Sequence, residues 1–316
     1  MQDTTSSETE VMQCMEVWGG SQPIDAHIQM SGLDAWVYCK PFQGATAGGD
    51  VYYVSSCATG RITRLLVADV AGHGAASEEP ARVLRDLMRK YVNYLDQTRF
   101  VEEMNGKFVA LSECGCFATA VVTTFFATNG QLSICNAGHP PPLVYRAGAK
   151  SWSFLESVSS EGEIHSDLPL GVVERVGYQL GQFSLGTGDM LLCYTDSLVE
   201  ARRQNGEWLG MEGLLRIARG LNDCESSGIV RRLLDAIASE CSGGTDADDM
   251  TVLVFRANGQ GRRIPLRIRC LAPLRVIRGV AGALRRGVAA PWPELSLANI
   301  GGAFLPALGN RWRGRR

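Results

Sequence analysis

The chain has 316 residues, 45% of them hydrophobic and 20% charged, with a formal net charge of −2, the composition of an ordinary soluble protein with a large core. No run approaches the roughly 20 apolar residues that a membrane-spanning helix needs. The start, MQDTTSSETEVMQ, has neither a basic end nor an apolar centre, so a secretory signal peptide is excluded and a cytoplasmic location is expected.

Strand and helix patterns alternate in the first third of the chain. Three segments rich in β-branched and aromatic residues predict strands, at 34–41, 51–56 and 61–70. Ser77 can cap a helix in which apolar residues recur at helical spacing, and a second helix is expected over 99–111. Residues 1–30, before these strands, are predicted to be a polar segment that is disordered in part.

The middle of the chain predicts a hairpin followed by further strands and helices. Residues 116–127 and 131–138 flank an Asn129-Gly130 turn, the strongest short signal for a hairpin. The remaining predicted elements are strands at 143–148, 178–185, 189–195 and 250–256 and helices at 211–220 and 226–240, with a polar loop at 156–168. Groups of strands interrupted by paired helices predict an α+β layered domain over residues 31–256.

The C-terminal part differs in charge from the rest. Residues 257–316 hold 12 arginines and one acid, a balance of +11, so residues 1–256 hold the other 19 basic and 32 acidic residues, a balance of −13. This predicts an acidic body and a basic extension. Apolar residues between Leu274 and Val288 recur at helical spacing. The extension is therefore an amphipathic helix on an anionic membrane face, a cover docked on the body, or a disordered tail.

Aspartates stand at the edges of four apolar, strand-like runs. They are Asp50 after two glycines, Asp69 in LLVADVAGHG, Asp196 after MLLCYT, and the pair Asp248-Asp249 before MTVLVF. Carboxylates gathered at one rim of a sheet repel one another unless cations neutralise them. Oxygen ligands without a histidine or cysteine cluster favour magnesium or manganese over zinc. The pattern predicts phosphoryl chemistry at a pair of metal ions.

Five blocks carry a resemblance to a known family. They are GGDVYYV, VADVAGHG, CNAGHPPPLVY, GDMLLCYTDSLVEAR and DDMTVLVFR, and together they resemble the signature motifs of the PPM-type serine/threonine phosphatases. The bacterial branch typified by the stage II sporulation protein E and RsbU phosphatases is the most similar. The resemblance runs from about Asp34 to Arg256. It implies two packed, mainly antiparallel sheets flanked by helices, with two Mn²⁺ or Mg²⁺ ions in a cleft at one end.

The resemblance also implies a reaction and roles for individual residues. Phosphoserine or phosphothreonine in a protein would be hydrolysed by a metal-bridging water, and the sequence shows no motif for a covalent nucleophile. Asp50 and Asp69 would bridge the ions and act in catalysis. The other expected metal ligands are the Val70 carbonyl, Asp196, Asp248 and Asp249. The family pattern favours Asp248 over Asp249 as the direct ligand.

Two histidines have open roles. His73 lies four residues after Asp69, and its imidazole could protonate the departing serine or threonine oxygen, although a loop histidine without a role is the alternative. His139 lies in a proline-rich turn, where contact with substrate and a structural role are both open.

Two departures from the family pattern favour a second hypothesis. Tyr53 stands where relatives usually carry an aspartate, and Ser197 stands where they usually carry a glycine. These changes favour a catalytically inactive phosphatase fold that serves as a binding or regulatory module. The retained aspartates argue against it, because an inactive fold has no physical need for a costly cluster of acids.

Expectations about partners follow from the same resemblance. The expected substrate is a phosphorylated protein, an anti-sigma-factor antagonist in a partner-switching pathway. About thirty residues before the first predicted strand are too few for an upstream sensor domain. Nucleic-acid binding is not expected, because the basic residues belong to no known module. The ten scattered cysteines are read as reduced thiols, with a metal or redox role for Cys114 and Cys116 left open.

Overall fold

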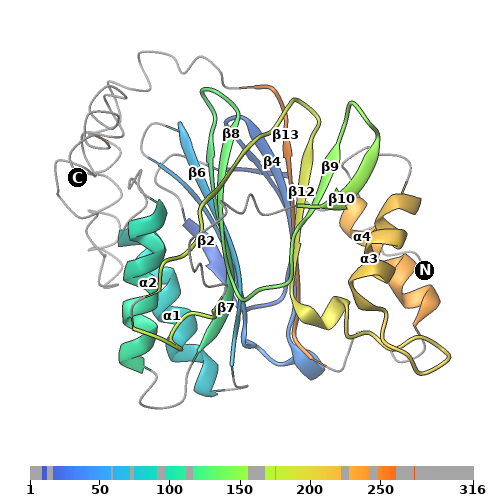
Figure 1. Cartoon of the computed structure of the whole chain (residues 1–316), viewed down its shortest axis with the longest axis horizontal. Helices are drawn as coiled ribbons and strands as arrows, with labels where there is room; N and C mark the ends of the chain where they lie inside the picture. The colour runs from blue at the N-terminus through green and yellow to red at the C-terminus, as the bar shows by residue number, and fades with distance from the viewer. Residues whose placement is uncertain are drawn as a thin grey trace.

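The computed structural model describes residues 9–12, 17–57, 60–71, 75–90, 97–111, 117–155, 168–174, 176–221, 228–241, 248–260 and 274. Two β-sheets pack face to face, and a pair of helices covers the outer face of each sheet (Figure 1). The predicted α+β class, with two mainly antiparallel sheets flanked by helices, is confirmed.

The first sheet has seven strands. In spatial order they are β1 (Thr9–Val11), β3 (Ile24–Met30), β4 (Leu33–Lys40), β13 (Met250–Ala257), β12 (Met190–Tyr194), β9 (Leu143–Arg146) and β10 (Ser151–Phe154). Neighbours pair antiparallel except β1 and β3, which are parallel. The last strand in the sequence, β13, therefore lies in the middle of the sheet, where both of its faces are covered. Its nearly continuous apolar run matches that position.

The second sheet has six strands, all paired antiparallel. In spatial order they are β11 (Gly181–Ser184), β8 (Gln131–Ala137), β7 (Ala118–Phe126), β6 (Ile62–Val70), β5 (Asp50–Ser56) and β2 (Val17–Gly20). The predicted hairpin is the β7–β8 pair. Alternate residues of these strands enter different cores. In β5, Tyr52 and Val54 face the other sheet, whereas Val51 and Tyr53 face the helices.

The helices lie where the sequence predicted them. On the second sheet they are α1 (Ala75–Lys90) and α2 (Gln97–Leu111), and on the first they are α3 (Gly210–Gly220) and α4 (Ile229–Glu240) (Figure 1). Two short 3₁₀ helices, η1 (Phe42–Gly44) and η3 (Asp196–Leu198), begin soon after strands of the first sheet. Of the helices in the described part of the chain, none is long and apolar enough to cross a bilayer.

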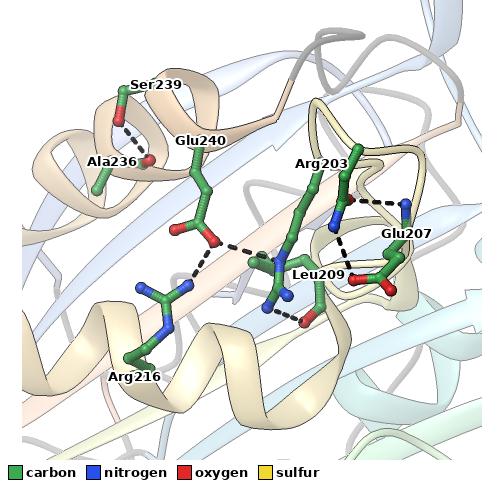
Figure 2. Close-up of polar contacts among 8 residues, drawn as sticks. Arg203, Glu207, Leu209, Arg216, Ala236, Ser239 and Glu240 are labelled. Atoms are coloured by element: carbon green, nitrogen blue, oxygen red, sulfur yellow. Dashed lines mark hydrogen bonds and ion pairs between the residues drawn. The ribbon is translucent and has the colours of Figure 1, made fainter.

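One glutamate and two arginines connect α3 and α4 to the loop that precedes α3. Glu240, the last residue of α4, accepts from Arg216 of α3, and its Oε1 lies 3.2 Å from Nε of Arg203 in the loop (Figure 2). Arg203 also donates from Nη2 to the Leu209 carbonyl at 3.0 Å. The loop that follows η3 is thereby fixed to both helices.

Both ends of the predicted domain differ from expectation. Strands β1, β2 and β3 lie within residues 1–30. They form because their backbone groups pair with β3, β5 and β4, respectively. The ordered body thus starts before residue 31, and the expectation of a partly disordered segment holds for none of these strands. At the other end β13 runs one residue past Arg256. The predicted helix between Leu274 and Val288 lies outside the described residues, apart from Leu274 itself.

Candidate metal centre

The first two predicted ligands are brought together by strand register. Asp50 begins β5, Asp69 is the penultimate residue of β6, and the two are directly paired across the antiparallel ladder. Val70 follows at the end of β6, and its N–H donates to the Gly49 carbonyl at 3.2 Å. The two motifs, nineteen positions apart in the sequence, therefore form one edge of the second sheet.

Asp50 is held from the opposite sheet. Its side chain is 2% exposed, and its Oδ2 accepts from the Thr195 hydroxyl at 2.7 Å. Thr195 directly precedes η3, and its Oγ1 accepts in turn from the Thr251 N–H of β13 at 2.9 Å. A chain of hydrogen bonds thus links β13, the start of η3 and β5 across the interface between the sheets.

Asp249 holds the glycine turn that precedes Asp50. Its Oδ2 accepts from the Gly49 N–H at 2.6 Å, and its Oδ1 accepts from the Phe42 N–H at 2.7 Å. A Cβ atom on Gly48 would stand only 2.2 Å from Oδ1 of this carboxylate, so the turn needs glycine at that position. Both carboxylate oxygens of Asp249 therefore bind backbone N–H groups, and its place among the metal ligands stays a prediction.

Asp248 and Asp196 lie on the outer side of the same group. Asp248 is exposed, and its Oδ1 accepts from the backbone N–H of Asp249 at 2.8 Å. Asp196 begins η3, and the N–H of Glu200 donates to its carbonyl at 2.9 Å. Glu200 is exposed and one turn beyond Asp196. The only sequence signal for Glu200 was its position four residues after Asp196, which places it near the other acids.

The charges of these acids act on one another. Burial raises the pKa of Asp69 to about 7, and the charges of Asp196, Asp248, Asp249 and Glu200 add to this rise. Burial also raises the pKa of Asp50 well above its ordinary value, against the hydrogen bond from Thr195, and Asp69 and Asp249 raise it further. The pKa values of Asp196 and Glu200 are likewise raised, first by burial and then by neighbouring acids.

A set of oxygen donors with raised pKa values favours bound positive charge. Cations relieve the repulsion between carboxylates, and hard oxygen donors are the preferred ligands of Mg²⁺ and Mn²⁺. The donor chemistry therefore fits the two divalent ions that the sequence predicted. In the part of the chain that the structure describes, no three of these side chains come close enough together to hold an ion by themselves.

His139 joins the same edge through buried contacts. It is 5% exposed, and its Nδ1 lies 2.8 Å from Oγ1 of Thr119, which pairs with Asp69 across the β6–β7 ladder. Its backbone N–H donates to Asn136 Oδ1 at 2.8 Å, and burial lowers the pKa of its imidazole to about 4. These buried hydrogen bonds favour a structural role for His139. Contact with substrate stays a prediction.

The two departures from the family pattern lie in different surroundings. Tyr53 is three residues from Asp50 and points to the other face of β5, where it packs against α1 and donates to the Ala81 carbonyl at 2.8 Å. Ser197 is buried, with its Oγ 3.4 Å from Thr195 Oγ1, and its N–H stabilises the charged form of Asp196. Tyr53 therefore lies on the face of β5 opposite to Asp50, whereas Ser197 lies beside Thr195 and Asp196.

Two predicted sites cannot be placed. His73 lies outside the described residues, as do Cys114 and Cys116, so their roles stay predictions. The described free cysteines are all buried: Cys39, Cys57, Cys135, Cys193 and Cys241.

The chain resembles a known protein family and two curated proteins. A family model described as stage II sporulation protein E (SpoIIE) matches residues 59–258, more than half of the chain. The chain is 21% identical over 197 residues to the phosphoserine phosphatase RsbU of Bacillus subtilis (strain 168), an alignment that covers 61% of this chain and 55% of RsbU. It spans still less, 21%, of a second curated relative.

Solved structures share the fold. The RsbU and RsbW domains of Rv1364c from Mycobacterium tuberculosis match with a TM-score of 0.59 and 21% identity, over 83% of this chain and 70% of that one. The catalytic domain of the serine/threonine protein phosphatase PstP, in complex with two manganese ions, matches with a TM-score of 0.51 and 18% identity, over 71% and 99%. On the family match, this chain belongs to the stage II sporulation protein E (SpoIIE) family of PPM-type protein phosphatases.

Proposed function

We propose that this chain hydrolyses phosphoserine or phosphothreonine in a protein substrate with the help of two divalent ions, Mn²⁺ or Mg²⁺. The observation that carries the proposal is the gathering of acids from four distant segments. Asp50 and Asp69 are paired across β5 and β6, and the charges of Asp196, Asp248 and Asp249 add to the rise that burial causes in the pKa of Asp69. PstP, whose fold is similar, is described with two manganese ions.

The chain's own residues would divide the work as follows. Asp50 and Asp69 would hold both ions, with the Val70 carbonyl, Asp196 and Asp248 as further ligands. Asp249 would keep the Gly48-Gly49 turn in place. When bound, the ions supply positive charge and an activated water for in-line displacement at phosphorus.

His73 would donate a proton to the leaving oxygen. His73→Ala should then lower the rate on a phosphoserine peptide far more than the rate on an aryl phosphate, whose leaving group needs no proton. Equal losses on the two substrates would contradict this role.

The proposed substrate is a phosphorylated anti-sigma-factor antagonist. The support comes from the relatives: RsbU is named a phosphoserine phosphatase, and the Rv1364c structure joins an RsbU domain to an RsbW domain. Both comparisons support a regulator that acts on another protein in a partner-switching pathway, and the location proposed for it is the cytoplasm. The acidic body offers no attraction to phosphate, so the ions must provide it.

Metal-dependent hydrolysis tests the proposal. The purified chain should release phosphate from a phosphoserine peptide in the presence of Mn²⁺ and stop when EDTA is added. Asp69→Asn should lower the rate more than about 100-fold, beyond the loss typical of residues that only support a ligand. Asp235→Asn, on an exposed residue of α4, is the matched control and should leave the rate unchanged.

Two outcomes would redirect the proposal. Turnover of equal size with EDTA would contradict a metal mechanism. Tight binding of Mn²⁺ without turnover on any phosphopeptide would favour the inactive binding module instead.

The basic extension is proposed to make a peripheral membrane contact. From residue 261 on it lies outside the described residues, apart from Leu274, so composition alone supports this. Its +11 charge should let the full chain sediment with anionic vesicles at low salt and release it at high salt, as ions screen the arginines. Failure to sediment at low salt would leave docking on the body or disorder.

A further inference from the structure

We propose that Thr195 is the positioning residue that sets the orientation of the Asp50 carboxylate for metal binding. The link to metal rests on the proposed function. The orientation itself rests on contacts within the chain. Thr195 is fully buried, and it stands between Asp50 on the second sheet and Thr251 on the first.

The direction of each hydrogen bond follows from the chemistry of the groups. A backbone N–H can only donate, so the bond from Thr251 at 2.9 Å makes Thr195 Oγ1 an acceptor there. The single hydroxyl hydrogen of Thr195 remains for another partner. Of the acceptors nearby, Asp50 Oδ2 is at 2.7 Å, whereas Ser197 Oγ and the Thr251 carbonyl are both at 3.4 Å. The hydrogen therefore goes to Asp50, in a short bond typical of a charged acceptor.

The position of Thr195 in its own helix supports this assignment. It is the N-cap residue of η3, and at an N-cap a threonine hydroxyl usually accepts from a backbone N–H of the following turn. Here the side chain makes no such bond. Its hydroxyl is directed across the sheet interface, so the usual stabilisation of the helix start is replaced by contact with Asp50.

The consequence concerns the two oxygens of Asp50. Oδ2 has a fixed donor, which prevents the carboxylate from turning about its Cβ–Cγ bond. Oδ1 then also keeps one orientation, at the strand position that is paired with Asp69. Holding a ligand in place before the ion arrives lowers the cost of binding, and loss of such supporting groups typically weakens metal affinity roughly 10- to 100-fold.

The test compares two substitutions at one site. Thr195→Val keeps the shape and removes the hydroxyl, and Thr195→Ser keeps the hydroxyl. Isothermal titration with Mn²⁺ should give a dissociation constant roughly 10- to 100-fold weaker for Thr195→Val, and one within about threefold of wild type for Thr195→Ser. Thr123→Val is the matched control, because it removes another buried hydroxyl, one that donates to the Leu65 carbonyl, and it should not change the affinity.

The outcomes separate this inference from the proposed function. If wild type and Thr195→Val bind Mn²⁺ equally, the positioning role is wrong and the phosphatase proposal stands. If wild type binds no Mn²⁺, the proposed function fails. A crystal structure of metal-free Thr195→Val then still decides the orientation: Asp50 turned away from its wild-type position supports the inference, and an unmoved Asp50 overturns it.

Discussion

At the scale of single residues, the acids of the candidate metal centre destabilise the folded protein when no ions are bound. Asp50 is almost completely buried and Asp69 is partly buried, and each lies among other acids. A buried carboxylate beside like charges favours its protonated form, so the metal-free protein carries free energy that bound cations would release. Retention of such a group is the physical reason to expect a bound ion.

Asp69→Asn should stabilise the metal-free protein at neutral and alkaline pH. Folded Asp69 keeps its proton up to about pH 7, whereas the unfolded carboxyl loses it near pH 4, so its contribution to the free energy of unfolding falls as the pH rises between these values. In EDTA at pH 8 the variant should be more stable by about 1–4 kcal/mol, at about 1.4 kcal/mol per pKa unit. Denaturant melts from pH 4 to 8 would measure this. A variant less stable than wild type at pH 8 would contradict it.

At the scale of elements, one buried amide connects α2 to the segment that follows residue 168. Asn105 is 2% exposed, and its Oδ1 accepts from the Gly171 N–H at 3.0 Å and the Tyr178 hydroxyl at 3.2 Å. Its Nδ2 donates to the Val173 carbonyl at 2.8 Å. The same segment pairs with the start of β7 through Leu170. No local pattern indicates this connection, since the partners are 66 or more positions apart.

Asn105→Ala should therefore loosen this segment as well as destabilise the fold. It removes several hydrogen bonds at once and leaves the buried N–H of Gly171 without its acceptor, which should cost about 2–4 kcal/mol. Hydrogen exchange should become faster at 170–174. Lys107→Ala, on an exposed residue of the same helix, is the control and should change neither quantity. Unchanged exchange in Asn105→Ala would show that Leu170 alone holds the segment.

At the scale of the whole molecule, the end of the body can be located from backbone pairing. Beyond Arg256, Ala257 donates to the Asp189 carbonyl at 3.0 Å and accepts from the Gly188 N–H at 2.7 Å. Asn258 donates from Nδ2 to Asp34 Oδ1 at 3.0 Å. These contacts extend the ordered body to Asn258, two residues beyond the boundary at residue 256 that the sequence predicted.

A chain that ends at Gln260 should fold and keep its metal-dependent hydrolysis, because every strand of both sheets is complete. A chain that ends at Arg256 should be less stable by about 2 kcal/mol or more, since it loses several hydrogen bonds at the centre of the first sheet. Denaturant unfolding of the two chains measures the difference. If the longer chain fails to fold, residues after 260 belong to the core.

Sequence and structure each determined a different part of the result. Local patterns were sufficient for most strands, the four helices and an α+β layered domain, because alternation and helical spacing are properties of neighbouring residues. The arrangement in two packed sheets came from the family resemblance. They also marked Asp50, Asp69, Asp196 and Asp248 as the acids at strand edges. Strands β1 and β2 were missed because only three and four residues carry each pattern and distant strands stabilise them. Strand β3 was missed although its seven residues alternate between apolar and polar side chains.

What only the tertiary structure decided is which groups meet across the sheets. Thr195 and Asp50 are 145 positions apart, and Asp249 and Gly49 are 200 apart, so no local pattern could connect them. The side on which Tyr53 points was likewise set by the register of β5, which turns successive side chains to opposite faces. Composition and spacing thus determined that acids would gather, and the packing of two sheets determined which hydroxyl and which backbone groups hold them.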